Sequence, residues 1–241
     1  MSSDPNDLAL LGIITTSNPQ NIDEVIEVMT AIDAVLPGTD GLRWFNWLYL
    51  EVTKAVLNDP LAAGFNNPHW LRRLDVIFAK LYFASVNTFL TQQDTPSSWQ
   101  ALFESRHKAR IERIQFALAG MNAHINHDLS LALLQTNAAL NLAPAKGGPE
   151  HRDFERVNDI LERVLPATLH VLAEGGIIGE VAEDTGKVGQ LLAIWKVRQA
   201  RDLAWDFADH LKSLGPIRRR LALVAQDKLT GVIGRTLLLH S

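Results

Sequence analysis

The sequence predicts an all-α fold, a single-domain bundle of about seven helices. Apolar residues recur at intervals of three and four along most of the chain, as in helices that bury one face. Proline or glycine closes the periodic segments, and no segment alternates apolar and polar residues as a half-buried strand does. The chain has 241 residues, the length of one large domain. We therefore expect one helical domain over 1–241, with an N-terminal arm over 1–19.

The first three helices are expected between residues 22 and 92. Asp40 is suited to cap the second helix, because its carboxylate can accept a hydrogen bond from a free backbone N–H. Asn67 followed by Pro68 is a cap with proline at the first helical position. Pro37-Gly38 and Asp59-Pro60 close the preceding segments. The expected helices cover about 22–35, 40–59 and 67–92.

A helical pattern then begins at Thr95-Pro96 and continues to about Leu140. An unbroken helix of that length would be about 66 Å long, too long for a compact domain. We expect a break or kink at Gly120 or in the His-Asn-His stretch over 124–127. The segment over 143–149, rich in glycine and proline, is expected to be a loop and a candidate mobile lid.

Three further helical segments are expected in the last third of the chain. One starts near Glu150, and Pro166 is expected to kink or split it. A turn at Gly175-Gly176 follows, then helices over about 184–214 and 217–239. The last helix begins with a run of three arginines over 218–220. This run favours a solvated helix end over contact with an acidic lipid surface.

Composition excludes several classes of protein. Apolar residues make up 47% and charged residues 21%, as in ordinary globular domains. The net charge of −4 argues against nucleic-acid binding. The chain has no cysteine, so disulfides, thiol nucleophiles and thiolate metal sites are excluded. No signal peptide is recognisable and no segment has the roughly 20 apolar residues that a membrane span needs, so we expect a cytoplasmic protein without stable membrane insertion.

Several polar residues fall on helix faces that should be buried. Asp75 shares the apolar stripe of its helix, where a charge needs a partner. His124 and Asp128 are four residues apart and about 40° apart on a helical wheel, so they can chelate one cation or form a hydrogen-bonded pair. His127 lies about 60° from His124 and is expected at the edge of the same site, as a catalytic group.

The later helices add further polar candidates. His151 and Asn158 share the inward stripe of their helix. On the next helix, Trp195 and Asp202 share a face, with Arg198 between them; a helical ion pair between Arg198 and Asp202 explains that spacing adequately. In the functional interpretation, Arg198 holds an anionic group of the substrate, and Asn158 and Trp195 contact the substrate.

Two interpretations of these residues stay open. In the first, each buried polar group only satisfies another. In the second, the inward-pointing residues of four helices form a metal site, which we favour because unpaired buried charge is costly. A ligand set of histidine and aspartate without cysteine suits zinc, iron or manganese. The predicted metal ligands are Asp75, His124, Asp128, His151 and Asp202.

Other catalytic motifs are weak or missing. Glu104 and His107 have the Glu-x-x-His spacing of di-iron bundles, but that class needs the motif twice. There is no nucleophile elbow, phosphate-binding loop or dinucleotide-binding fingerprint. Serine hydrolases with a nucleophile elbow, kinases and dehydrogenases are therefore disfavoured.

The stretch Gly120-Met-Asn-Ala-His-Ile-Asn-His-Asp-Leu129 resembles an all-helical bacterial family known only as a domain of unknown function. Further segments of the same resemblance are 47–53, 78–82, 151–154 with 157–158, and 195–205. The resemblance implies a shared helical domain and no particular activity. His124 and Asp128 are also similar to one element of the zinc-dependent phospholipase C and single-strand nuclease class, which places a His and an Asp four residues apart as metal ligands. That class also uses a processed amino terminus as a ligand, and this chain shows no signal peptide.

The sequence thus leaves two hypotheses of different classes. One is a metal-dependent enzyme that acts on a small, partly hydrophobic substrate, which can carry an anionic group, by hydrolysis through a metal-activated water or by oxygen chemistry. The other is a non-catalytic small-molecule binding or scaffold protein with a buried polar network. The sequence does not indicate an oligomeric state.

Overall fold

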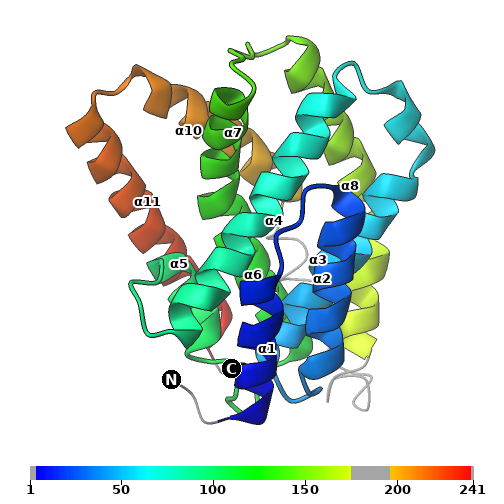
Figure 1. The fold of residues 1–241 in the computed structure, drawn as a ribbon, viewed down its shortest axis with the longest axis vertical. Helices are drawn as coiled ribbons and strands as arrows, with labels where there is room; N and C mark the ends of the chain where they lie inside the picture. Colours follow the sequence, from blue (N-terminus) through cyan, green and yellow to red (C-terminus); the bar gives the residue numbers. More distant parts are fainter. Residues whose placement is uncertain (1–3, 175–195, 240–241) are drawn as a thin grey trace.

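The computed structural model describes residues 4–174 and 196–239. Within these two stretches the regular structure is helical throughout and no residue lies in a strand, so the predicted all-α fold is confirmed (Figure 1). The α-helices are α1 (Pro5–Thr16), α2 (Ile22–Val35), α3 (Gly41–Asn58), α4 (Pro68–Leu90), α5 (Ser97–Phe103), α6 (Arg113–Ala123), α7 (Leu129–Ala139), α8 (Pro149–Glu174), α10 (Val197–Ser213) and α11 (Pro216–Leu237), with a 3₁₀ turn η1 (Pro60–Gly64) and a π turn η2 (His124–Asp128).

Side-chain caps start α3 and α4 where the sequence predicts them. The Asp40 carboxylate accepts a hydrogen bond from the backbone N–H of Leu42 at 2.9 Å. Asn67 Oδ1 accepts one from the backbone N–H of Trp70 at 3.1 Å. Each cap satisfies a backbone N–H that has no partner within its helix. The starts of α3 and α4 could therefore be predicted from a few neighbouring residues.

The expected N-terminal arm is instead a helix. In α1, Asp4 caps the first turn by accepting from the backbone N–H of Asn6 at 2.8 Å. Leu10 and Ile14 are buried, and the helix packs against α2 and α4. With only two buried positions, α1 shows too little periodicity to be recognised without its neighbours.

The long helical pattern over 95–140 is broken twice. The π turn η2 lies in the His-Asn-His stretch where a break is predicted. The other break, between α5 and α6, is not at Gly120 but over 104–112. Arg106 lies in this connection, fully buried, and its guanidinium forms ion pairs with Asp40 and, at 3.0 Å, with Asp7. Because both partners lie far away in the sequence, the periodicity could not reveal this turn.

Gly120 has a different role, since it permits close packing. A Cβ atom there would lie 2.3 Å from Cγ of Phe45, so only glycine lets α6 approach α3 at this point. Phe45 in turn packs against Tyr82 and Trp99, with ring centroids 5.0 and 5.2 Å away. These buried rings form the aromatic centre of the bundle.

In the last third of the chain, Pro166 is expected to kink or split its helix. The helix α8 continues through this exposed proline without being split. The predicted turn at Gly175-Gly176 and the beginning of the helix expected over 184–214 lie outside the described residues. The connection over 142–148 is a loop, as predicted.

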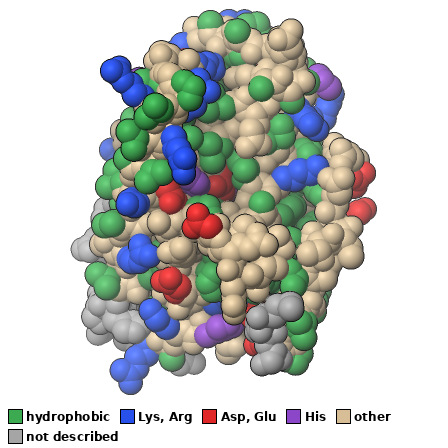
Figure 2. Space-filling view, turned by 60° about the vertical axis from the view of Figure 1, so that its left-hand side comes forward, with side chains coloured by type: hydrophobic (Ala, Val, Ile, Leu, Met, Phe, Trp, Pro, Cys, Tyr) green, Lys and Arg blue, Asp and Glu red, His purple; other side chains and the backbone are tan. Residues whose placement is uncertain are grey.

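The long helices run roughly along the long axis of the molecule, with α1 and α2 on one side and α10 and α11 on the other (Figure 1). The face shown in Figure 2 carries Lys and Arg side chains among many hydrophobic ones. In the part of the chain that the structure describes, no helix combines the length and the apolar character that crossing a bilayer requires.

Candidate functional site

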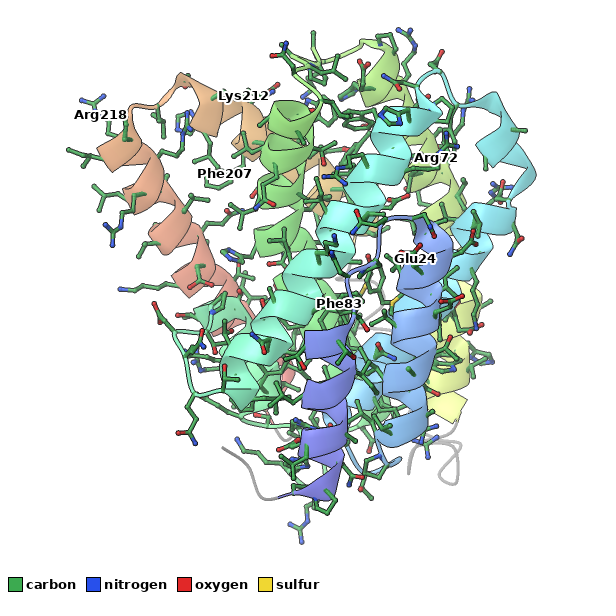
Figure 3. The ribbon with its side chains drawn as sticks, in the orientation of Figure 1. Glu24, Arg72, Phe83, Phe207, Lys212 and Arg218 are labelled. Carbon is green, nitrogen blue, oxygen red and sulfur yellow. The ribbon has the colours of Figure 1, made fainter. Side chains whose placement is uncertain are left out.

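A cavity of about 300 Å³ lies between α3, α4, α8 and the π turn. Its wall is mainly apolar, which suits a small, largely apolar ligand. Arg72, labelled on α4 in Figure 3, lines the cavity and is exposed, so it lies at the opening. The other polar residues that line it are Tyr49, Thr53, Asp75, His124 and Arg201.

His124 is held in place by a hydrogen bond and by ring stacking. Its Nδ1 lies 2.9 Å from Oδ2 of Asp128, and the Trp99 indole N–H donates to the same oxygen at 3.0 Å. The imidazole stacks on Phe78 with the ring centroids 3.5 Å apart and the planes 5° apart. The first and last residues of the π turn thus form a hydrogen-bonded pair, at a type of helix irregularity that is frequent at functional sites.

The other nitrogen of His124 is the notable feature of the site. Nε2 is buried and has no hydrogen-bond partner in the described part of the chain. Burial lowers the pKa of His124 well below its ordinary value, so the ring is neutral. With Asp128 ionised, His124 donates through Nδ1, and Nε2 carries the free lone pair. Buried polar atoms without a protein partner are uncommon, and a bound water, a ligand or a catalytic role can account for one.

Two carboxyl groups of the site have unusual proton affinities. Burial raises the pKa of Asp75 to about 7, although the nearby Arg201 opposes the change. Asp75 makes no hydrogen bond or ion pair with any described residue. Burial also raises the pKa of Asp128 to about 7, against the effects of His127 and of the Trp99 hydrogen bond. Both groups therefore change protonation near neutral pH, the condition for acid–base chemistry.

Arg201 is the buried cation of the cavity. It is buried, and its Nε donates to Oδ1 of Asn158 in a short hydrogen bond while its guanidinium lies 4.2 Å from the ring centroid of Phe154. Burial lowers the pKa of Arg201 to about 10, against the attraction of Asp75 and Glu155. Asn158 is therefore a neighbour of the cavity cation and does not itself line the cavity.

The structure brings together some of the predicted site residues. His124 and Asp128 form the predicted pair, and Asp75 lines the same cavity as His124. His127 is buried but does not line the cavity, so the expectation that it lies at the edge of this site is wrong; its Nδ1 lies 3.9 Å from a carboxylate oxygen of Asp227.

The remaining predicted residues do not line the cavity. His151 lies edge-on to Trp205, with its Nε2 3.8 Å from a carboxylate oxygen of Glu155. Asp202 accepts a hydrogen bond from Asn158 at 3.3 Å, and burial and the neighbouring Glu155 raise its pKa.

Arg198 is engaged elsewhere, and its expected pairing with Asp202 is not what the structure has. Its guanidinium forms ion pairs at 2.5–2.9 Å with Glu155, Asp159 and Glu162, all on α8. Trp195 lies outside the described residues.

The five predicted metal ligands do not form one cluster. In residues 4–174 and 196–239, no three His, Cys, Asp or Glu side chains come close enough to one another to hold a metal ion. The helical wheel placed each side chain on an inward face correctly for His124, Asp128 and Asp75. The wheel could not show that His151 and Asp202, on α8 and α10, lie away from the cavity that His124 and Asp75 line.

Sequence reasoning missed Arg201, Tyr49 and Trp99. A signal for Arg201 was present, because it lies four residues before the buried Trp205 and so shares the inward stripe of α10. Trp99 was missed because its hydrogen bond joins α5 to the π turn across 29 residues of sequence.

Comparison with known proteins adds a family and no activity. No curated protein and no solved structure matches this chain. The similarity to the zinc-dependent phospholipase C class is not shown by any match. The resemblance to an uncharacterised family is supported, because a family model matches residues 22–240. The chain belongs to the family described as a family of unknown function, DUF5995.

Proposed function

We propose that the protein is an enzyme that binds a small, largely apolar molecule in the cavity and carries out proton-transfer chemistry on it, most simply hydrolysis. The observation that carries this proposal is the buried Nε2 of His124, which has no partner among the described residues while Nδ1 is held by Asp128. A positioned neutral imidazole of this kind is suited to remove a proton from a substrate hydroxyl or from water.

The other polar groups take complementary roles in this proposal. Asp128 orients the imidazole and stabilises the imidazolium that forms when Nε2 accepts a proton. Asp75, with its pKa raised to about 7 by burial, acts as the general acid. Arg201 donates hydrogen bonds to an oxygen of the substrate, and the apolar wall binds the rest of the molecule.

The test is a panel of p-nitrophenyl esters with acyl chains of increasing length. His124→Gln should lower kcat by at least about 100-fold, the usual contribution of a general base. His151→Gln is the matched control, since His151 does not line the cavity. Hydrolysis that is equally fast in wild type and His124→Gln would refute the role of His124.

The cavity itself can be tested on one helix. Val157→Trp fills the cavity, because Val157 lies in its wall, whereas Val171→Trp on the same helix changes an exposed position. Ester hydrolysis should be lost in the first variant and kept in the second. Equal activity of the two variants would place the reaction elsewhere.

The alternative function is non-catalytic binding of a small molecule in the same cavity. It predicts that an apolar ligand raises the melting temperature of the wild type and of His124→Gln, with no turnover of any ester. Loss of binding in Val157→Trp would then locate the ligand.

A metal-dependent form of the enzyme is a second candidate. One observation favours it: Nδ1 of His124 lies 2.9 Å from a carboxylate oxygen of Asp128, an arrangement that metal-binding histidines commonly have. His124 and Asp75 would need further ligands, such as water or substrate, because the described residues supply no third one. Metal analysis of the purified protein, and of Asp75→Asn, tests this form directly.

A further inference from the structure

The helix α11 has an unusual first half. Over residues 216–229 it has no buried residue, although it is helical throughout. Its buried residues lie further on, where Thr230, Gly231 and Gly234 pack against α5 and α6. In Figure 1 this helix runs along one side of the molecule, joined to α10 at its far end. Most side chains in the first half of α11 are therefore exposed, and none is fully buried.

Large hydrophobic side chains gather on this helix. Of thirteen exposed large hydrophobic residues in the described chain, seven lie on α11 or directly after it. Ile217 is 79% exposed, Leu221 64% and Val232 59%. Scattered single residues of this kind are ordinary, but a concentration on one element marks an interaction surface.

Cations lie on the same face. Helix α11 has five Lys and Arg residues and one carboxylate, Asp227, a net charge of +4 in a chain whose net charge is −4. At 100° per residue, six exposed side chains that are large and hydrophobic or cationic fall within an arc of about 100° on the side opposite Thr230 and Gly234. This set, the α11 stripe, is Ile217, Arg218, Leu221, Lys228, Val232 and Arg235.

The cations of the α11 stripe are unpaired. Arg218, Lys228 and Arg235 form no ion pair or hydrogen bond with any described residue. Arg219 differs, since it donates to the backbone carbonyls of Leu211 and Leu214 and so holds the turn between α10 and α11. Asp227 is also occupied, because it accepts from the backbone N–H groups of Ser97 and Ser98 at 2.9 Å.

We propose that the α11 stripe binds the surface of an anionic lipid bilayer. Its apolar side chains would enter the boundary between headgroups and acyl chains, while its cations remain among the lipid phosphates. A second copy of the same stripe is a poorer partner, because it would place unpaired cations against unpaired cations. Nucleic acid would neutralise the charge but leave the apolar side chains in water.

The experiment is co-sedimentation of the full chain with vesicles. Binding is expected to vesicles of phosphatidylserine and phosphatidylcholine, and not to vesicles of phosphatidylcholine alone. It should weaken between about 0.1 and 1 M salt, as the screening length falls from about 10 to 3 Å. Equal binding to both vesicle types, or to neither, overturns the proposal.

Paired variants separate the contribution of the cations to vesicle binding from that of the apolar side chains. Arg218→Gln with Lys228→Gln should weaken binding roughly fivefold for each charge, since a cation near an anionic surface contributes about that factor. The matched control removes two paired lysines elsewhere, Lys54→Gln with Lys146→Gln. Unchanged binding of the α11 variant, or an equal loss in the control, counts against the stripe.

A second double variant, with its own control, tests the contribution of the apolar side chains to vesicle binding. Leu221→Gln with Val232→Gln should weaken binding, whereas Leu8→Gln with Val171→Gln, at positions of similar exposure, should not. All substitutions are at exposed positions, and circular dichroism checks that the helices persist. If light scattering shows a dimer that only the α11 variant loses, the stripe joins two copies of the chain and the lipid proposal is wrong.

Discussion

Replacement of Asp75 by asparagine should stabilise the protein at alkaline pH. The carboxyl group lies in the cavity wall, on a half-buried residue, without a hydrogen bond or ion pair to a described residue, and desolvation there disfavours its charged form in the folded state. Asparagine has nearly the same shape and carries no charge. Such a gain is expected at a functional site, where residues are retained for chemistry at the expense of stability.

The size and direction of the effect follow from the pKa. Burial raises the pKa of Asp75 from 3.8 to about 7. The folded protein therefore binds one more proton than the unfolded chain between these values, and the free energy of unfolding falls as the pH rises through this window. At 1.36 kcal/mol per pKa unit the loss is about 4 kcal/mol by pH 8. The variant lacks this loss.

Chemical denaturation at a series of pH values measures the difference. Wild type and Asp75→Asn should have similar free energies of unfolding near pH 4 and diverge to about 4 kcal/mol at pH 8, with the variant more stable. Asp33→Asn, at a partly exposed carboxylate paired with Arg43, is the control and should show no such divergence. If Asp75→Asn is no more stable than wild type at pH 8, the carboxyl group is not desolvated as argued.

Two further substitutions test the packing that positions the site. Gly120→Ala should lower the free energy of unfolding by about 1–3 kcal/mol, because its Cβ would overlap the Phe45 ring. Gly12→Ala should raise the free energy of unfolding by about 0.4–1 kcal/mol, because no atom lies within 4 Å of the added Cβ. Urea titration of both variants gives the comparison, and equal effects would contradict the close contact at Gly120. Arg106→Met should destabilise by about 3–5 kcal/mol because it leaves the Asp40 carboxylate buried without its cation; a thermal melt that matches wild type would show that the pair is dispensable.

The helix boundaries that sequence predicted well are those set by local chemistry. The Asp40 and Asn67 caps act on N–H groups two or three residues away, so their effect is visible in a short window of sequence. The boundary over 104–112 is different, because the buried Arg106 is paired with residues 66 and 99 positions earlier. Periodicity contains no information about such partners.

The candidate site divides in the same way. The pairing of His124 with Asp128 could be predicted, since two residues four apart on a helix are neighbours whatever surrounds them. The expectation that His151 and Asp202 join them needed the distance between helices, which a helical wheel does not contain. The wheel also gave no reason to choose Arg201 over Arg198, although only Arg201 reaches the cavity.

By itself, the sequence determined that this protein is all-helical, where most helices begin and end, and that His124 and Asp128 turn away from water. Periodicity and capping act within a few residues, so one chain of letters is enough to show them. Only the tertiary structure decided which inward residues meet, that the Nε2 of His124 has no partner among the described residues, and that the first half of α11 is left uncovered. These properties depend on how helix axes pack against one another, and that packing results from contacts between residues far apart in the sequence.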